Sequence, residues 1–326
     1  MNARILITII ISYTIALQSI ATTTTTATTS KDTKECESSS TNSDNNNNED
    51  DIPVEIIRNG KTEIVPSTNF IQISILNNKF TPTVTNITGG ESINLKYVKS
   101  FLSKDEVHKL ISICDKRSGW QTSPQNMGGD GNIKVNTKKR TSSSCPIIWP
   151  LLYLPKLKMY KESGRLTSSV EDEINFSWSI TQRIASLLNI KEEYIEPLQL
   201  IRYHKGQFYR QHHDHGLYYG TSTSEQRPLT FLIFLSSMKN NGMGGQTKFN
   251  NLNIEIIPNI GDGVIWSNVD NDNKILLDAI HEAIPPTNDN SDDGDDDDGI
   301  IKYAMNVWIT DKPVMDNIDS SIYRTY

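Results

Sequence analysis

The spacing of apolar residues changes near residue 195. Before this point two segments repeat apolar residues at helical spacing, about 104–116, which follows a capping box of Ser103 and Glu106, and about 170–188. Beyond it, short alternating or wholly apolar runs predict strands over about 198–203, 229–235, 246–249, 252–257, 263–266, 278–284 and 303–309. Short strands preceded by helices predict a mainly β protein with flanking helices (α+β), arranged as a sandwich or barrel.

The N-terminal region has a different character. Residues 1–21 place Arg4 before an apolar run at 5–17 and small residues before Ala21, which predicts a cleaved signal peptide. An uncleaved anchor is the alternative, and contact with a membrane is expected only in that case. Residues 22–51 are rich in Thr, Ser and Asn and are predicted to be disordered. Residues 52–92 contain short alternating runs and form an N-terminal extension. The main domain is expected at 93–311, with a C-terminal tail at 312–326.

The charge distribution argues against nucleic acid as a partner. The formal net charge is −7, and residues 287–299 hold seven Asp and no basic residue, so the rest of the chain sums to zero (−7 + 7). The stretch 285–299 is interpreted as an acidic loop inserted between two strands. It is not an EF-hand, because Ile300 stands where such a loop needs a bidentate Glu.

Three cysteines and two sequons fit passage through the ER or Golgi lumen, or secretion. Cys36 lies in the tract predicted to be disordered, so Cys114 and Cys145 are the expected disulfide pair. Asn86 and Asn175 begin Asn-x-Ser/Thr sequons, and Asn86 is the better candidate for glycosylation because Asn175 falls in a predicted helix.

Four of the six histidines crowd into residues 203–215. On an extended strand, residues two apart share a face, so His212 and Asp214 point together. A distant His would complete a facial triad for Fe(II), which leaves positions open for a bidentate acid and O2. His281 is the expected third ligand, because the other remote histidine, His108, falls in a helix. A shift of one residue would instead make His215 a ligand.

The order of motifs from residue 93 to 311 resembles the catalytic domain of the prolyl 4-hydroxylase branch of the Fe(II)/2-oxoglutarate dioxygenases. The matching segments are 101–103, Arg140-Thr141-Ser142, 198–203, Gly206-Gln207 with Tyr209, His212-x-Asp214, Gln226-Arg227, 230–232, Gly244-Gly245-Gln246-Thr247-Lys248-Phe249, Gly261-Asp262-Gly263, Trp266, His281 with Pro285, and 302–308. The resemblance implies a double-stranded β-helix, or jelly roll. The acidic loop lengthens the usual spacing between His281 and Lys302, and Tyr303 stands where the family commonly has Trp.

The resemblance also implies roles for single residues. His212, Asp214 and His281 would bind Fe(II), and Lys302, Tyr203 and Thr247 would hold 2-oxoglutarate. The substrate groove for a proline-containing peptide would be lined by Tyr209, Arg227 and Trp308. Ascorbate would keep the iron reduced. Collagen-type relatives work with a disulfide isomerase, but no separate peptide-binding domain is recognisable here, so we expect a monomer.

The function implied is 2-oxoglutarate-dependent hydroxylation of prolyl residues in proteins of the secretory pathway. One alternative is a sister dioxygenase that acts on another residue or on a small molecule. Another is a catalytically inactive module that binds proline-rich peptides, although such a module would not need to keep His212, Asp214, His281 and Lys302.

Overall fold

The computed structural model describes residues 54–65, 69–70, 73–75, 78–80, 83–87, 93–123, 125–126, 133–215, 227–238, 243–287 and 300–314. The predicted signal peptide, the tract at 22–51, most of the acidic loop and most of the C-terminal tail lie outside these residues. Within the described part of the chain, no helix combines the length and apolar character needed to cross a membrane.

The larger of two main sheets has nine strands, each antiparallel to its neighbours. In spatial order these are β3 (Asn69–Phe70), β6 (Thr83–Asn86), β7 (Lys96–Lys99), β17 (Gly263–Ser267), β14 (Leu229–Phe234), β19 (Lys302–Ile309), β12 (Gln199–Tyr203), β11 (Ser143–Pro146) and β8 (Gln121–Thr122). Strand β19, which comes last in sequence among these nine, therefore lies inside the sheet, between β14 and β12.

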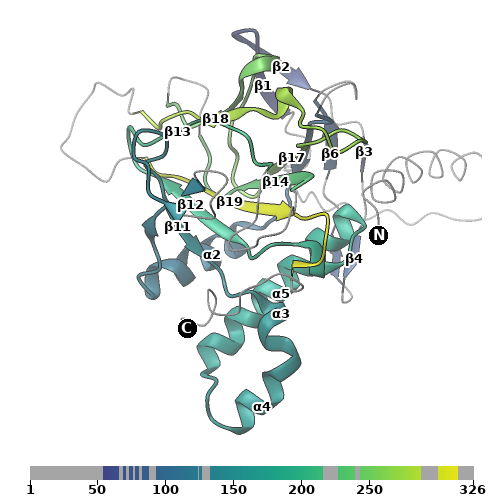
Figure 1. The fold of residues 1–326 in the computed structure, drawn as a ribbon, viewed down its shortest axis with the longest axis vertical. Helices are drawn as coiled ribbons and strands as arrows, with labels where there is room; N and C mark the ends of the chain where they lie inside the picture. The colour runs from purple at the N-terminus through teal and green to yellow at the C-terminus, as the bar shows by residue number, and fades with distance from the viewer. Residues whose placement is uncertain are drawn as a thin grey trace, which may run out of the picture.

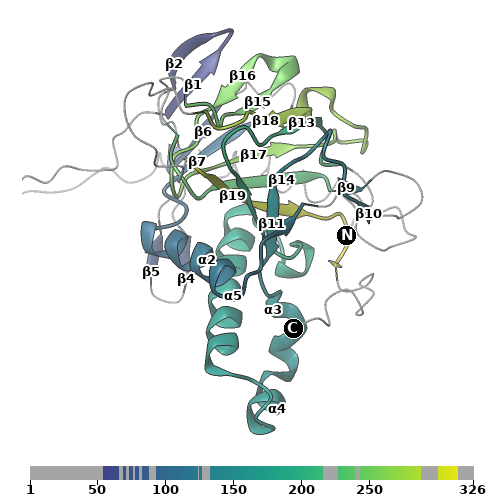
Figure 2. The same ribbon diagram turned by 90° about the vertical axis from the view of Figure 1, so that its left-hand side faces the viewer.

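The smaller main sheet has six strands, in the order β13 (Tyr209–His212), β18 (His281–Ala283), β15 (Thr247–Phe249), β16 (Ile254–Ile256), β1 (Val54–Arg58) and β2 (Lys61–Val65). It lies over the larger sheet (Figure 2). The two sheets form the jelly roll that the sequence predicts. Two hairpins stand apart, β4 (Ile73–Ile75) with β5 (Asn78–Phe80), and β9 (Gln125–Asn126) with β10 (Ile133–Lys134).

The segment at 52–92 supplies strands to both main sheets. Strand β1 pairs with β16, with Ile56 opposite Ile256, and β6 pairs with β7. Val54, Ile56 and Val65 belong to the apolar core between the sheets. This segment is therefore part of the jelly roll rather than an appendage to it.

Two long helices cover the outer face of the larger sheet (Figures 1 and 2). Helix α2 (Lys104–Lys116) begins at the predicted capping box, in which the Ser103 side chain accepts from the Glu106 N–H and the Glu106 carboxylate accepts from the Ser103 N–H. Helix α5 (Ser168–Leu188) begins after its N-cap Thr167 and ends at Asn189.

The sequence did not predict α3 (Pro150–Tyr153) and α4 (Leu157–Glu162), which project away from the sheets (Figure 1). Both are too short to show a helical repeat. The 3-10 turns are η2 (Leu154–Lys156), η3 (Glu192–Tyr194), η4 (Asn250–Leu252) and η5 (Leu277–Ala279). Turn η4 takes up the start of the strand predicted at 252–257, so β16 is shorter than predicted. Turn η5 does the same at 278–284, so β18 is shorter than predicted.

The larger sheet separates two apolar cores, and the alternation of side chains along its strands assigns residues to one or the other. In β14, Phe231 and Ile233 face the helices, whereas Leu232 and Phe234 face the smaller sheet. In β19, even-numbered residues lie on the side of Ala304, which belongs to the core between the sheets. Lys302 and Trp308 are therefore on the inner face, toward the smaller sheet.

A disulfide joins Cys114 at the end of α2 to Cys145 in β11, with Cα atoms 6.1 Å apart. This is the pair expected from the sequence. Both cysteines are fully buried in the core beneath the helices. The bond covalently links helix α2 to strand β11 and so joins the helical layer to the larger sheet.

Candidate metal centre

Three potential metal ligands meet between the two sheets. His212 is the last residue of β13 and His281 the first residue of β18, and the two stand opposite each other in this strand pair. Asp214 lies two residues beyond His212, in a bend after the strand has ended. The ligand atoms of His212, Asp214 and His281 all lie within 4.8 Å of one another. The predicted triad is therefore assembled. The sequence predicted that Asp214 lies on the same strand as His212, but in the structure the strand ends at His212.

Backbone hydrogen bonds orient both imidazoles in the same way. The Nδ1 atom of His212 is 2.9 Å from the Arg210 carbonyl oxygen, and that of His281 is 2.9 Å from the Ala279 carbonyl oxygen. A carbonyl can only accept, so each Nδ1 carries the proton and donates it, and each Nε2 keeps a free lone pair. These Nε2 atoms face Asp214, at 3.7 Å from Oδ1 for His212 and 3.8 Å from Oδ2 for His281.

These contacts provide a test of whether the residues fit Fe(II). The nitrogen–oxygen separations are too long for hydrogen bonds and leave space for an ion between the three side chains. Two neutral imidazoles and one carboxylate form the donor set of a non-haem Fe(II) facial triad. The residues present therefore fit this metal.

The electrostatics of the site keep His212 and Asp214 in the protonation states that a metal requires. Burial lowers the pKa of His212 well below its usual value, and the neighbouring His281 lowers it further. Burial by itself raises the pKa of Asp214, but His281, His212, Arg227 and a hydrogen bond from Thr230 outweigh it and hold that pKa at about 2. His212 is thus neutral and Asp214 ionised at neutral pH.

Aromatic rings enclose the histidines. Tyr209 stacks on His212, with ring centroids 3.4 Å apart and planes 13° apart. Trp266 and Phe249 lie against His281, at 4.8 Å and 5.8 Å between ring centroids. This packing restricts rotation of both imidazoles and keeps their Nε2 atoms directed at Asp214.

A buried cation lies on the same inner face. Lys302 is 1% exposed, and its Nζ is 3.4 Å from both the Gln246 carbonyl oxygen and the Thr247 hydroxyl. It stands opposite Tyr203 in the pairing of β12 with β19, with its Nζ 5.6 Å from the centre of the Tyr203 ring. The structure thus brings together the three residues assigned to 2-oxoglutarate.

Lys302 pairs with no carboxylate among the described residues. Burial alone lowers its pKa to about 7. A buried ammonium without a counter-charge is costly, and an anionic ligand would remove that cost. The environment of Lys302 therefore suits the carboxylate of a bound acid.

The residues assigned to the substrate groove differ in their surroundings. Arg227 forms a two-pronged ion pair with Glu196 at 2.6 Å and 2.8 Å, and its guanidinium lies 4.0 Å from the centre of the Trp308 ring. Tyr209 lies by the metal ligands, with the Arg140 guanidinium 4.6 Å from its ring centre. The sequence alone does not indicate a role for Glu196, which is 2% exposed. In the sequence, Glu196 is marked only by its position next to Pro197, just before the predicted strand at 198–203.

Two histidines of the cluster at 203–215 point elsewhere. The Nε2 of His213 donates to the Leu276 carbonyl at 3.0 Å, and its Nδ1 accepts the backbone N–H of His215 at 3.0 Å. Neither residue belongs to the group of potential ligands around Asp214. The geometry favours the register with His212 over the alternative with His215.

Comparison with known proteins agrees with this geometry. Residues 198–310 match the family model of the 2OG-Fe(II) oxygenase superfamily. Prolyl 4-hydroxylase 13 of Arabidopsis thaliana is 31% identical over 132 residues, which cover 35% of this chain and 47% of that protein. A putative prolyl 4-hydroxylase of Acanthamoeba polyphaga mimivirus is 29% identical over 140 residues, which cover 41% and 52%. The chain thus spans about half the length of these curated relatives.

Among solved structures, the viral collagen prolyl hydroxylase from Paramecium Bursaria Chlorella virus-1, in complex with 2OG, is 20% identical. That match covers 69% of this chain and 98% of the other, with a TM-score of 0.44. A Pseudomonas putida prolyl-4-hydroxylase is 16% identical, covers 66% and 91%, and has a TM-score of 0.38.

The region that carries the metal centre, residues 198–310, therefore belongs to the 2OG-Fe(II) oxygenase superfamily. Over this region the chain is similar to the two curated prolyl 4-hydroxylases. The resemblance inferred from the motif order is confirmed for this region.

Proposed function

We propose that this protein is a 2-oxoglutarate-dependent dioxygenase that hydroxylates prolyl residues of peptides or proteins. Two observations together carry the proposal. Two imidazole Nε2 atoms and one carboxylate are aimed at a common point. On the same inner face lies the buried Lys302, which has no carboxylate partner among the described residues. The three ligand atoms would bind a metal ion and leave coordination positions open on it, and Lys302 would bind the carboxylate of an acid.

His212, Asp214 and His281 would hold Fe(II), which supplies the redox chemistry that couples decarboxylation of 2-oxoglutarate to hydroxylation of a C–H bond by O2. Lys302 would bind the distal carboxylate of 2-oxoglutarate through a charge-assisted hydrogen bond, with Thr247 beside it. Tyr203 would close the other side of this pocket. The aromatic rings around the histidines keep bulk water from the reacting atoms.

Tyr209 and Trp308 would form the aromatic wall on which a proline-rich segment docks. Such a segment already has the polyproline II conformation and loses little entropy on binding. The ion pair with Glu196 fixes the Arg227 guanidinium, which lies 4.0 Å from the centre of the Trp308 ring, so the two side chains hold each other in place. Ascorbate is expected to restore iron oxidised in turnovers without product.

We also propose that the protein works in the ER or Golgi lumen or outside the cell, with 1–21 as its signal peptide. The buried disulfide between Cys114 and Cys145 supports this placement, because such bonds persist in oxidising compartments.

The experiment is turnover of 2-oxoglutarate to succinate by the purified protein, with Fe(II), ascorbate and a polyproline peptide, beside a His212→Ala control. We expect peptide-stimulated succinate and a proline that gains one oxygen atom, both absent in the control. Turnover that no proline peptide stimulates would favour the sister-dioxygenase alternative. Iron-loaded, folded protein without turnover would favour the inactive binding module.

A further inference from the structure

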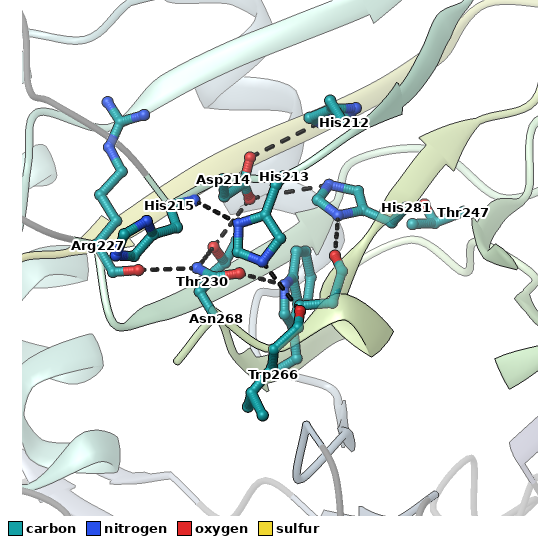
Figure 3. A network of polar contacts seen from close by, with 12 residues as sticks. His212, His213, Asp214, His215, Arg227, Thr230, Thr247, Trp266, Asn268 and His281 are labelled. Atoms are coloured by element: carbon teal, nitrogen blue, oxygen red, sulfur yellow. Dashed lines mark hydrogen bonds and ion pairs between the residues drawn. The ribbon is translucent and has the colours of Figure 1, made fainter. Parts of the chain in front are cut away.

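A chain of buried hydrogen bonds runs behind Asp214 (Figure 3). The Trp266 indole N–H donates to Asn268 Oδ1 at 3.0 Å, and Asn268 Nδ2 lies 2.8 Å from the Thr230 hydroxyl. The Thr230 hydroxyl in turn lies 2.9 Å from Asp214 Oδ2. Thr230 and Asn268 are fully buried, and Trp266 is 1% exposed.

The direction of every bond in this chain follows from the chemistry of its ends. An indole N–H can only donate, so the Asn268 atom facing Trp266 must be the amide oxygen. The amide nitrogen must then face Thr230, and it also donates to the Arg227 carbonyl oxygen at 3.0 Å. A flipped amide would put two donors together at Trp266 and two acceptors together at Arg227.

The Thr230 hydroxyl has one proton to give. Since Asn268 Nδ2 can only donate, the hydroxyl accepts there and directs its own proton at Asp214 Oδ2. The Asn268 backbone is held as well, because its N–H donates to the Pro228 carbonyl at 2.8 Å and its carbonyl accepts from Leu276 N–H at 3.0 Å. All hydrogen-bonding groups of Asn268 are thus in use, and the chain has a single orientation.

This orientation matters for how many positions on a metal Asp214 can occupy. Two imidazoles and one carboxylate oxygen take three of six positions and leave three for a bidentate keto acid and O2. A carboxylate that chelates through both oxygens would take a fourth position. The Thr230 proton occupies a lone pair of Oδ2 and disfavours that chelation.

We propose that Thr230, Asn268 and Trp266 are positioning residues that keep Asp214 a one-oxygen ligand and so preserve the open position. The inference rests on the proposed function only for the identity of the acid that uses this position. A hydroxyl that serves packing alone would satisfy the same hydrogen bonds but would leave the metal spectrum unchanged on removal.

The test replaces the hydroxyl while keeping the shape. Thr230→Val removes the donor and Thr230→Ser keeps it. Thr85→Val is a matched control, because Thr85 is also a fully buried strand residue and its hydroxyl has no hydrogen-bond partner within the described residues. Each variant is loaded with Co(II), and its visible d–d absorption is recorded before and during titration with 2-oxoglutarate.

We expect Thr230→Val to change the Co(II) spectrum in the absence of any acid and to weaken 2-oxoglutarate binding, on the order of the 10- to 100-fold losses in metal affinity or activity that follow the loss of a partner of a metal ligand. Thr230→Ser should restore both properties, and Thr85→Val should resemble the parent protein. A Thr230→Val spectrum and affinity equal to those of the parent would refute the proposal.

Two further results keep the test decisive. If the parent binds Co(II) but not 2-oxoglutarate, the proposed function fails, and the metal-only spectra still decide the role of Thr230. If Thr230→Val does not fold, Thr230→Ala replaces it, because it removes the same hydroxyl proton without placing a methyl group where Asn268 Nδ2 approaches. That variant should shift the metal-only spectrum in the same direction as expected above, and an unchanged spectrum would again refute the proposal.

Discussion

Replacing Lys302 with methionine should stabilise the protein when 2-oxoglutarate is absent. Burial lowers the pKa of Lys302 from 10.5 to about 7, a difference of 3.5. At about 1.4 kcal/mol per pKa unit, the burial of this ammonium costs up to about 5 kcal/mol of folding free energy. Methionine has a similar length and no charge, so the variant should recover much of that cost.

The sign of the pH dependence follows from the same shift. The pKa is lower in the folded than in the unfolded state, so between about pH 7 and 10.5 the unfolded chain binds more protons at Lys302. The contribution of Lys302 to the free energy of unfolding therefore rises with pH across this window. The stabilisation by methionine should be largest below pH 7 and vanish near pH 10.5.

The assay is denaturant unfolding of the metal-free protein at pH 6.5 and pH 9.5. Lys248→Met is the control, because Lys248 is partly exposed, pairs with Glu255 at 3.0 Å and should matter by under about 1 kcal/mol. In a second series with Co(II), 2-oxoglutarate should stabilise the parent and the control but not Lys302→Met. A Lys302→Met protein less stable than the parent at both pH values, and still stabilised by 2-oxoglutarate, would refute the reasoning.

Three other outcomes can be checked. The affinity for 2-oxoglutarate should fall about tenfold per pH unit above pH 7, since binding then requires Lys302 to take up a proton; isothermal titration that finds constant affinity up to pH 9 would contradict this. Replacing both Cys114 and Cys145 with alanine should lower the free energy of unfolding by about 3–4 kcal/mol, because the bond closes a loop across 31 residues, and an unchanged denaturation midpoint would argue against the bond. Glu196→Gln should cost about 3–5 kcal/mol in the same assay, because a neutral amide no longer balances the charge of the largely buried Arg227 guanidinium; a loss under 1 kcal/mol would show that other groups or water replace the carboxylate.

Periodicity identified the elements that bury a regular stripe or face. Helices α2 and α5 follow their caps and apolar spacing closely. Strands β14 and β19 have runs of apolar residues because both of their faces are covered. The short helices α3 and α4 escaped prediction because neither is long enough to show a repeat, and the turns before β16 and β18 have no signal that distinguishes them from the strands they precede.

Spacing along the chain located the metal ligands but not the side chains that support them. His212 and Asp214 are two residues apart, and the motif order identified His281 and Lys302. The supporting side chains form hydrogen bonds with residues 16 to 38 positions away in the sequence. Thr230 bonds to Asp214, Asn268 bonds to Thr230, and Glu196 bonds to Arg227. Nothing local to a strand indicates such a partner, because it depends on which strands are neighbours in the sheet.

The pairing of β1 with β16 has a consequence for synthesis. Arg58 finds its partner Ile254 only after nearly 200 further residues have been made, and the interior strand β19 follows later still. At roughly 5–20 residues per second, the first strands wait on the order of ten seconds or more with their edges unpaired. During this interval β1 and β2 form at most a hairpin, which is marginal in water by itself. The nascent chain is therefore exposed to aggregation until its last strand is released, and it should depend on chaperones more than a protein whose neighbouring strands are consecutive.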